Sequence, residues 1–244
     1  MANISQIKQK IKTFGQRFGI EISNFPNAAL RSRKQFMIKG KFDIVIDVGA
    51  NVGQFGKEIR YLGYTGQIIS FEPLTSAFTL LEKTASKDEN WIANHFALGD
   101  KNETTEINIS QHSASSSLLS FEENYISENK RLSIVNTEKI EVKKLDDIFN
   151  DFIPSEKCNI LLKLDTQGFE KAVLEGALGV LDKIAGIQIE TSHKELYKGE
   201  TLFLDMLVYL RELGFEVFTL EPYYYDVNTY QLLQTEVYLF NKKN

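Results

Sequence analysis

A glycine-containing segment, residues 47–53 (DVGANVG), follows a short apolar run and precedes a stretch of helical character. Glycine lets the backbone turn sharply and approach a ligand closely. The helix that follows presents unpaired N–H groups and the positive end of its dipole. The sequence therefore predicts a ligand site at this turn, although a turn that only connects strand and helix is the alternative. The residues expected to line it are Asp47, Gly49, Ala50, Asn51 and Gly53.

The spacing and charge of this segment indicate the type of ligand. Dinucleotide enzymes hold a pyrophosphate at such a turn with the spacing G-x-G-x-x-G, whereas this chain has G-x-N-x-G. Asp47 would repel a pyrophosphate. It suits S-adenosylmethionine, which brings an ammonium and a carboxylate group instead. The segment thus favours S-adenosylmethionine as the ligand.

A second carboxylate, Glu72, stands 25 residues after Asp47, at the end of the next apolar run. A carboxylate in this place can accept hydrogen bonds from both hydroxyls of a ribose. Pro73 follows it and can start a helix, so a surface position in front of a helix is the alternative. The location at the end of a strand favours ribose binding.

A third acidic position lies in the segment KLDTQGFE, residues 163–170. Asp165 closes a buried strand at the sheet edge where ligands bind in α/β proteins. We expect Asp165 to accept the proton of an acceptor hydroxyl or to orient that hydroxyl. Gly168 is expected to let the backbone turn into the next helix. Glu170 either caps that helix or faces the pocket.

The chain has three histidines. His193 follows a buried strand, and a histidine there is a natural general base near neutral pH. His95 is expected inside a strand in a structural role. His112 is expected to be solvated in a serine-rich loop at 111–120.

A divalent metal is an alternative means of activating a hydroxyl. Asp165, Glu190 and His193 stand at neighbouring predicted strand ends and could ligate such an ion. The chain has no pair of adjacent aspartates after the strand that ends at Glu190. We therefore predict catalysis without a metal, with Asp165 or His193 as the base.

The elements that must position these residues follow from hydrophobic periodicity. The first three strands alternate with two helices, as in a doubly wound sheet. No helix separates the last two strands, so they are expected to be antiparallel. Strands are predicted at 42–48, 67–71, 91–98, 104–110, 140–145, 160–164, 185–190, 215–220 and 236–240, and helices at 52–62, 74–84, 168–181 and 202–213.

Four segments, in their order and spacing, resemble the successive motifs of the FkbM family of methyltransferases over roughly residues 40–240: VIDVGANVGQF, ISFEP, NHFALGD and KLDTQGFEKAVLEGA. The resemblance implies the class I methyltransferase fold, an α/β, Rossmann-like, seven-stranded and mostly parallel sheet with helices on both faces and an antiparallel last strand. It implies S-adenosylmethionine as cofactor, with Pro73, Ala97 and Leu98 among the residues that hold it. It also implies an O-methyltransferase that acts on hydroxyls of sugars, glycans or related metabolites.

Two other functions compete with this one. An NAD-dependent oxidoreductase could use a similar sheet, but the missing G-x-G-x-x-G and the antiparallel last pair of strands count against it. A non-catalytic binding protein of the same fold is the second. The acidic positions Asp47, Glu72 and Asp165 are all present, which speaks against a loss of activity.

Charge is distributed unevenly along the 244 residues. Residues 1–41 carry nine Lys or Arg and one acid, Glu21, which leaves 19 basic and 32 acidic residues in the remainder. This acidic body argues against a nucleic-acid substrate, whereas the small-molecule or glycan acceptor is what the resemblance implies. The single cysteine, Cys158, excludes an internal disulfide and is expected to be a small core residue.

Residues 1–40 are predicted to form an amphipathic helical extension in front of a methyltransferase domain at 41–244. We expect its apolar stripe to pack on the main domain. The alternatives are a subunit contact or peripheral contact with a membrane surface. The chain shows neither a transmembrane run of about 18 apolar residues nor the apolar core of a signal peptide, so a cytoplasmic location is expected. The stripe repeats at spacings of three and four and consists of Ile4, Ile7, Ile11, Phe14 and Phe18.

Three consecutive tyrosines, Tyr223, Tyr224 and Tyr225, are expected in the connection between the last two strands. Exposed tyrosines can stack on a sugar ring, but aromatic residues are also enriched at subunit contacts. The final hairpin often lies away from the cofactor in this fold. We therefore predict a subunit contact, as in a homodimer.

Overall fold

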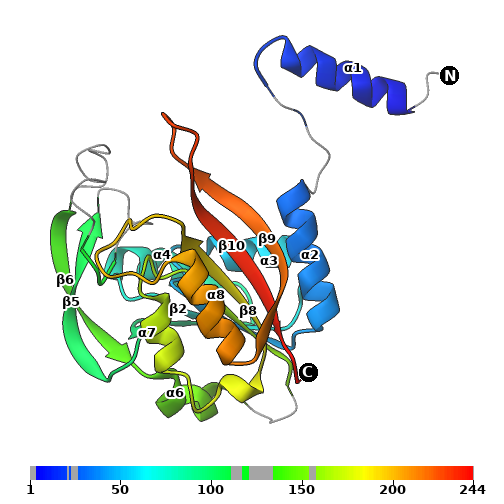
Figure 1. The fold of residues 1–244 in the computed structure, drawn as a ribbon. Coiled ribbons are helices and arrows are strands. Elements are labelled where there is room, and N and C mark those ends of the chain that lie inside the picture. Colours follow the sequence, from blue (N-terminus) through cyan, green and yellow to red (C-terminus); the bar gives the residue numbers. More distant parts are fainter. Residues whose placement is uncertain are drawn as a thin grey trace.

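A computed structural model describes residues 4–20, 22, 27–110, 117–120, 134–153 and 158–243. Its centre is a seven-stranded sheet with the strand order β3-β2-β1-β7-β8-β10-β9 (Figure 1). β10 is antiparallel to both of its neighbours, and the other pairings are parallel. The predicted fold class is confirmed. The strands are β1 (Ile44–Val48), β2 (Gln67–Phe71), β3 (Trp91–Asn94), β7 (Ile160–Leu164), β8 (Ile184–Ser192), β9 (Phe215–Tyr225) and β10 (Leu232–Asn241).

Helices cover both faces of this sheet. On one face they are α6 (Leu145–Phe152), α7 (Glu170–Glu175) and α8 (Phe203–Glu212). On the other face they are α2 (Ala28–Gly40), α3 (Gln54–Tyr61) and α4 (Thr75–Ala85). Among the described residues, no helix is long and apolar enough to cross a membrane.

The strand predicted at 91–98 is in fact two strands in different sheets. β3 ends at Asn94, and β4 (Ala97–Leu98) joins a small three-stranded sheet with β5 (Glu103–Ser110) and β6 (Ile134–Lys143). The strand predicted at 140–145 was also wrong at its end, because Leu145 begins α6. Helix α6 has only eight residues, so its helical periodicity is hard to distinguish in the sequence.

The two faces of the large sheet differ in chemistry. Toward α6, α7 and α8 the strands present mostly apolar side chains, such as Ile46, Leu162 and Ile187. Toward α2 and α3 the half of the sheet at the amino ends of its parallel strands is apolar, as at Val45 and Leu161. The second half of that face is buried but polar. In the register of the sheet, five such residues lie opposite one another across five adjacent strands: Ser70, Asp47, Lys163, Gln188 and Tyr238.

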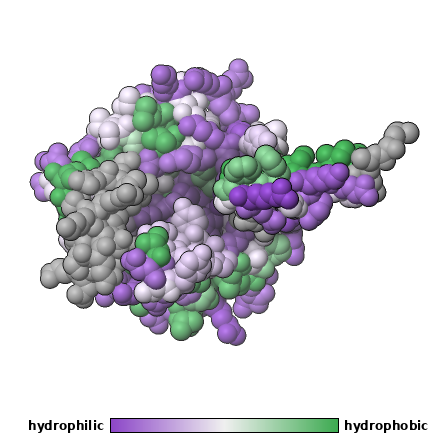
Figure 2. Space-filling model, turned by 90° about the horizontal axis from the view of Figure 1, so that it is seen from above, coloured by the Kyte–Doolittle hydropathy of each residue, from purple (hydrophilic) through white to green (hydrophobic). Residues whose placement is uncertain are grey.

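Residues 1–40 contain two helices with different environments. α2 packs on the sheet, and its Phe36 is fully buried against the rings of Phe42, Tyr238 and Phe240. α1 (Ile4–Gln16) stands away from the body (Figure 1), with a continuous apolar side (Figure 2). All five residues of its predicted stripe are 47–71% exposed. The prediction that this stripe packs on the main domain is therefore wrong.

The three consecutive tyrosines lie in strand β9, not in the connection after it as predicted. β9 pairs with β10 as far as Tyr225, so the connection consists of residues 226–231 only. The predicted subunit contact at these tyrosines stays a prediction.

The packing of α2 suggests that the folding unit begins at Ala28. We expect Phe36→Ala to lower the free energy of unfolding by about 3–5 kcal/mol, because it opens a cavity in a fully buried aromatic cluster. The matched control on the same helix is Ile38→Ala, at a residue that is 56% exposed. It should cost less than about 1 kcal/mol. Denaturant unfolding measures both, and equal midpoints for the two variants would contradict this assignment of α2.

Candidate active site

The glycine turn lies where β1 and β7 end side by side. Gly49 has φ of 72°, and a Cβ there would lie 1.9 Å from the carbonyl oxygen of Asp165. Gly49 is required because no side chain fits between these two backbones. The N–H groups of Gly49 and Ala50 both donate to the carbonyl of Phe71, each at 3.1 Å. The turn is therefore held against the ends of both neighbouring strands.

Glu72 connects the turn after β2 to the turn after β1. Its Oε2 accepts from the N–H of Asn51 at 2.8 Å, and its Oε1 accepts from the N–H of Leu74 at 2.9 Å. Burial raises the pKa of Glu72 to about 7, against the opposing effect of these N–H donors. Each carboxylate oxygen can accept a further hydrogen bond. Glu72 therefore shapes the site and can still receive donors from a ligand.

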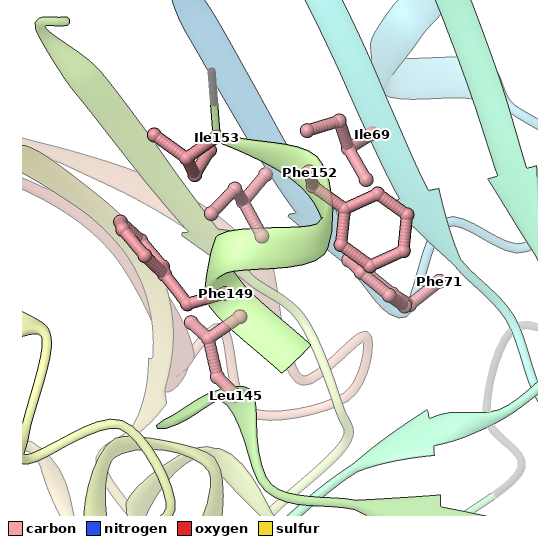
Figure 3. Close-up of a pocket in the computed structure, with 7 residues that line it drawn as sticks. Ile69, Phe71, Leu145, Phe149, Phe152 and Ile153 are labelled. Atoms are coloured by element: carbon pink, nitrogen blue, oxygen red, sulfur yellow. The ribbon is translucent and has the colours of Figure 1, made fainter. Parts of the chain in front are cut away.

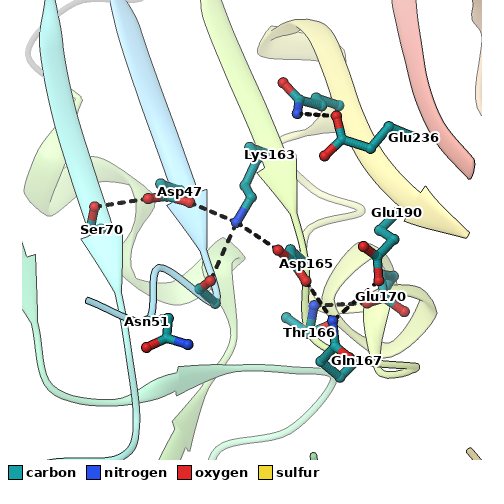
Figure 4. Close-up of polar contacts among 12 residues, drawn as sticks. Asp47, Asn51, Ser70, Lys163, Asp165, Thr166, Gln167, Glu170, Glu190 and Glu236 are labelled. Atoms are coloured by element: carbon teal, nitrogen blue, oxygen red, sulfur yellow. Dashed lines mark hydrogen bonds and ion pairs between the residues drawn. The ribbon is translucent and has the colours of Figure 1, made fainter. Parts of the chain in front are cut away.

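Asp47 is fully buried and does not stand alone. Its Oδ1 lies 3.1 Å from Nζ of Lys163, and its Oδ2 accepts from the hydroxyl of Ser70 at 3.2 Å. Trp91 in turn donates to the Ser70 oxygen at 3.0 Å. Figure 4 shows the contacts that run across the sheet from Ser70 through Asp47 to Lys163. The charge of Asp47 is thus already balanced from within the protein.

Lys163 links the two turns of this site, and the sequence motifs predicted no role for it. Its Nζ also donates to the Gly49 carbonyl at 3.3 Å and lies 3.5 Å from Oδ2 of Asp165. Burial lowers the pKa of Lys163, but the negative charges of Asp47 and Asp165 raise it by more. The pKa of Lys163 therefore lies above its ordinary value. A lysine within the apolar strand ILLKL was the signal that could have identified it.

Asp165 is the accessible carboxylate of this edge, with a side chain that is 37% exposed. Gln167, in the left-handed region at φ of 56°, donates to Oδ1 of Asp165 at 2.8 Å and to Glu190 at 3.2 Å. The hydroxyl of Tyr197 donates to the Gln167 carbonyl oxygen at 2.6 Å. Asp165 is therefore held from two sides, by Gln167 and by Lys163.

Two further glutamates lie buried beside Asp165. Glu170 accepts from the N–H groups of Thr166 at 2.7 Å and Gly168 at 3.3 Å, so it holds the turn after β7. Burial raises the pKa of Glu170 to about 7. The pKa of Glu190 is raised by burial first and then by the charges of Asp165 and Glu170. This edge therefore holds more negative charge than its cations balance.

Neither of the two described histidines, His95 and His193, joins this group. His193 contacts the hydroxyl of Thr235 at 2.7 Å, and its ring packs on Phe203 of α8, whereas Asp165 and Glu190 share Gln167. Burial lowers the pKa of His193. His95 is exposed between β3 and β4, where it stacks on Phe78, so it does not lie inside a strand as predicted. His112 lies outside the described residues.

The remaining predicted cofactor residues lie in front of α3, after β2 and in β4. Gly53 precedes α3 with φ of 82°, and Pro73 directly follows Glu72. Ala97 and Leu98 are buried in β4, which pairs with β6. Their side chains pack in the core, so only backbone groups of β4 are available to a ligand.

S-adenosylmethionine fits the donors and acceptors of this edge. Asn51 Oδ1 and Thr166 Oγ1 are buried and have no hydrogen-bond partner among the described residues. A buried polar atom without a partner is costly. The ribose hydroxyls and the ammonium group of this cofactor are donors that would satisfy such oxygens and the free lone pairs of Glu72.

Neither a metal cluster nor the apolar pocket beside α6 provides a second catalytic site among the described residues. In the part of the chain that the structure describes, no three His, Cys, Asp or Glu side chains gather as a metal site would require. A small apolar pocket lies between α6 and the sheet (Figure 3), where side chains such as Phe71, Phe149 and Phe152 line it. It offers no polar group for chemistry and belongs to the core.

The buried ion pair leads to a stability prediction. Lys163→Met should lower the free energy of unfolding by about 3–5 kcal/mol, because Asp47 is left buried without its counter-charge. The control Lys171→Met removes a partly exposed lysine 3.9 Å from Glu175 and should cost less than about 1 kcal/mol. Chemical denaturation measures both variants.

The double variant Asp47→Asn/Lys163→Met keeps this test informative if the single variant does not fold. It removes both charges and should recover part of the lost stability. If Lys163→Met is as stable as the unchanged protein, the ion pair between Asp47 and Lys163 does not stabilise the fold.

The sequence matches the family described as Methyltransferase FkbM domain over residues 47–217. No curated protein is similar enough in sequence to count as a match.

Among solved structures, the FkbM methyltransferase from Methylobacillus flagellatus KT is similar with a TM-score of 0.53 and 15% identity. The similarity covers 82% of this chain and 44% of that one, so this chain spans less than half of its length. A protein assigned as an S-adenosylmethionine-dependent methyltransferase from Listeria monocytogenes has a TM-score of 0.50 and 8% identity, over 88% of this chain and 98% of that one. At these identities the likeness is one of fold. The family match covers most of the chain, which therefore belongs to the FkbM methyltransferase family, whose cofactor is S-adenosylmethionine.

Proposed function

We propose that this chain transfers a methyl group from S-adenosylmethionine to a hydroxyl group of a sugar, a glycan or a related metabolite. The observation that carries this proposal is the position of Asp165. It is a partly exposed carboxylate beside the glycine turn, oriented by Gln167 and Lys163. Membership of the FkbM family identifies S-adenosylmethionine as the methyl donor. A carboxylate at the position of Asp165 is suited to take a proton from an alcohol.

The cofactor side of the site comprises the turns after β1 and β2. Glu72 would accept from the ribose hydroxyls, and Asn51 Oδ1 would accept from a further donor group. Because Asp47 is paired with Lys163, we infer that it acts by holding the turn and by adding negative charge near the ammonium group. The proposed cofactor residues are Asp47, Gly49, Ala50, Asn51, Gly53, Glu72, Pro73, Ala97 and Leu98.

The protein's part in the reaction is positioning and proton transfer. When bound, the cofactor supplies a methyl group activated by its sulfonium. An acceptor hydroxyl would donate its hydrogen bond to Oδ2 of Asp165. The proton would pass to this oxygen as the hydroxyl oxygen bonds to the methyl carbon and the methyl–sulfur bond breaks, with S-adenosylhomocysteine as the leaving group. Gln167 fixes the other oxygen of Asp165 at 2.8 Å, so Oδ2 keeps its direction. Lys163, at 3.5 Å, stabilises the negative charge before the transfer.

Tyr223 supports an acceptor with hydroxyl groups. Partial burial, followed by the charges of Glu190 and Asp165, raises the pKa of Tyr223 to about 12. Its phenol therefore lies within electrostatic range of the proposed base. The ring is 61% exposed and could stack on a sugar, which is the alternative to the subunit contact predicted for the three tyrosines.

Cofactor binding should depend on pH through Glu72. Its pKa of about 7 means that the carboxylate is protonated below this pH and ionised above it, and the ionised form accepts better from ribose hydroxyls. We expect the affinity for S-adenosylhomocysteine to rise up to about tenfold between about pH 6 and pH 8. Calorimetric titration at several pH values measures this.

The variant that isolates Glu72 is Glu72→Gln. It should weaken binding at about pH 8 by about 1.5–3 kcal/mol and flatten the pH dependence, whereas Glu82→Gln on the exposed side of α4 should change neither. A folded Glu72→Gln protein with unchanged affinity would remove Glu72 from the site. Tight binding of NAD instead of S-adenosylhomocysteine would favour the oxidoreductase.

Catalysis should depend on Asp165 more than on His193. Asp165→Asn keeps the shape of the side chain and removes the proton acceptor, so turnover should fall by about 10²–10⁴-fold, with less than about a threefold change in S-adenosylhomocysteine affinity. His193→Gln should change turnover less than about tenfold, because its ring faces α8. Release of S-adenosylhomocysteine with a panel of sugars and glycans measures turnover.

Three outcomes would contradict this assignment. Full activity of Asp165→Asn would exclude Asp165 as the base. Activity that vanishes with EDTA and returns with magnesium would favour a metal-assisted reaction. Absence of methyl transfer to any acceptor would favour a binding protein that has kept the fold.

A further inference from the structure

Helix α1 presents an apolar side that nothing in the described structure covers. Five residues, Ile4, Ile7, Ile11, Phe14 and Phe18, are each about half exposed or more. The chain after α1 turns back at Gly19, whose φ is 69°, and Ile20 donates to the carbonyl of Gly15 at 3.0 Å. Phe14 and Phe18 contact each other, with ring centroids 5.1 Å apart, so the apolar side continues through the end of the helix.

The cations of α1 lie on both borders of this apolar side. At about 100° per residue, the five apolar residues fall within an arc of about 80°. Lys8 lies about 40° beyond one border and Lys10 about 40° beyond the other, with Lys12 and Arg17 further round. The segment 4–20 contains no Asp or Glu. Polar uncharged residues, such as Gln9 and Thr13, occupy the opposite side.

We propose that α1 docks the protein on an anionic lipid surface. A helix of this kind lies in the plane of the membrane interface with its apolar side among the acyl chains. The stems of Lys8 and Lys10 can then lie along the lipid while their ammonium groups reach the phosphates of the headgroups. The acidic remainder of the chain would be repelled by that surface, so the attraction is confined to the basic N-terminal segment.

The same charges argue against a second copy of this chain as the occupant. When two such helices pair, the residues that flank the apolar seam face each other, and stable pairs place opposite charges there. In α1 these flanking residues are Lys8 and Lys10, and the segment has no acid to meet them. The helix also has only 13 residues, about two heptads, which is short for a coiled coil. Anionic lipid fits the charge pattern better.

The test is co-sedimentation of the full chain with vesicles of phosphatidylcholine, with and without phosphatidylglycerol. We expect binding to the anionic vesicles, weakened by high salt, and at least about tenfold weaker binding to neutral ones. Phe14→Ser/Phe18→Ser should reduce binding at least tenfold. Lys8→Gln/Lys10→Gln should reduce it about fivefold for each cation removed. The matched control on the polar side, Gln9→Ser/Thr13→Ser, should bind as the unchanged protein does.

Light scattering of the same proteins without lipid distinguishes docking on lipid from pairing with a second copy of this chain. A constant monomer mass in all variants, together with the losses above, supports lipid docking. The proposal is overturned if the unchanged chain does not bind anionic vesicles, or if the control variant loses binding as much as the Phe variant. A dimer mass that only the Phe variant abolishes would assign the apolar side to a second copy.

Discussion

Lys163 carries a positive charge in the middle of the sheet, within a row of buried polar residues that includes its neighbours Asp47 and Gln188. It contacts Asp47 on β1, the Gly49 carbonyl in the next turn and Asp165 at the end of its own strand. These three groups belong to the two turns that form the proposed site. The position of one ammonium group therefore fixes the spacing between the cofactor turn and the proposed base, and it compensates for the burial of Asp47.

The carboxyl half of this sheet face carries more acids than bases. Glu190, Glu236 and Glu221 lie opposite one another on three adjacent strands. Arg33 from α2 pairs with Glu236 at 2.7 Å. Nearer the centre of the sheet, Lys163 pairs with Asp47 and Asp165. Burial first, and then the charges of Asp165, Glu170 and Glu236, raise the pKa of Glu190. A cofactor with a sulfonium and an ammonium group adds positive charge at this edge, so the same excess that destabilises the free protein favours its binding.

The strand ends and the glycine turn could be predicted because local patterns determine them. The role of Lys163 could not, because it depends on the register that places Lys163 opposite Asp47. His193 shows that a short distance in sequence does not bring two side chains together. It stands three residues after Glu190, and side chains alternate between faces along a strand, so it contacts Phe203 while Glu190 contacts Gln167. The break near His95 likewise depends on β6, which is distant in sequence.

The two N-terminal helices show why periodicity alone does not decide what a helix packs against. α2 is only weakly amphipathic in sequence. Its Phe36 and Arg33 nevertheless contact Tyr238 and Glu236 of β10, which are about 200 residues away in the chain. α1 has the more regular stripe and no such partner. An isolated helix of 13 residues is marginally stable in water, because its backbone ordering is not offset by burial. A surface that covers the apolar side would supply that burial, so folding of α1 and docking are expected to be coupled.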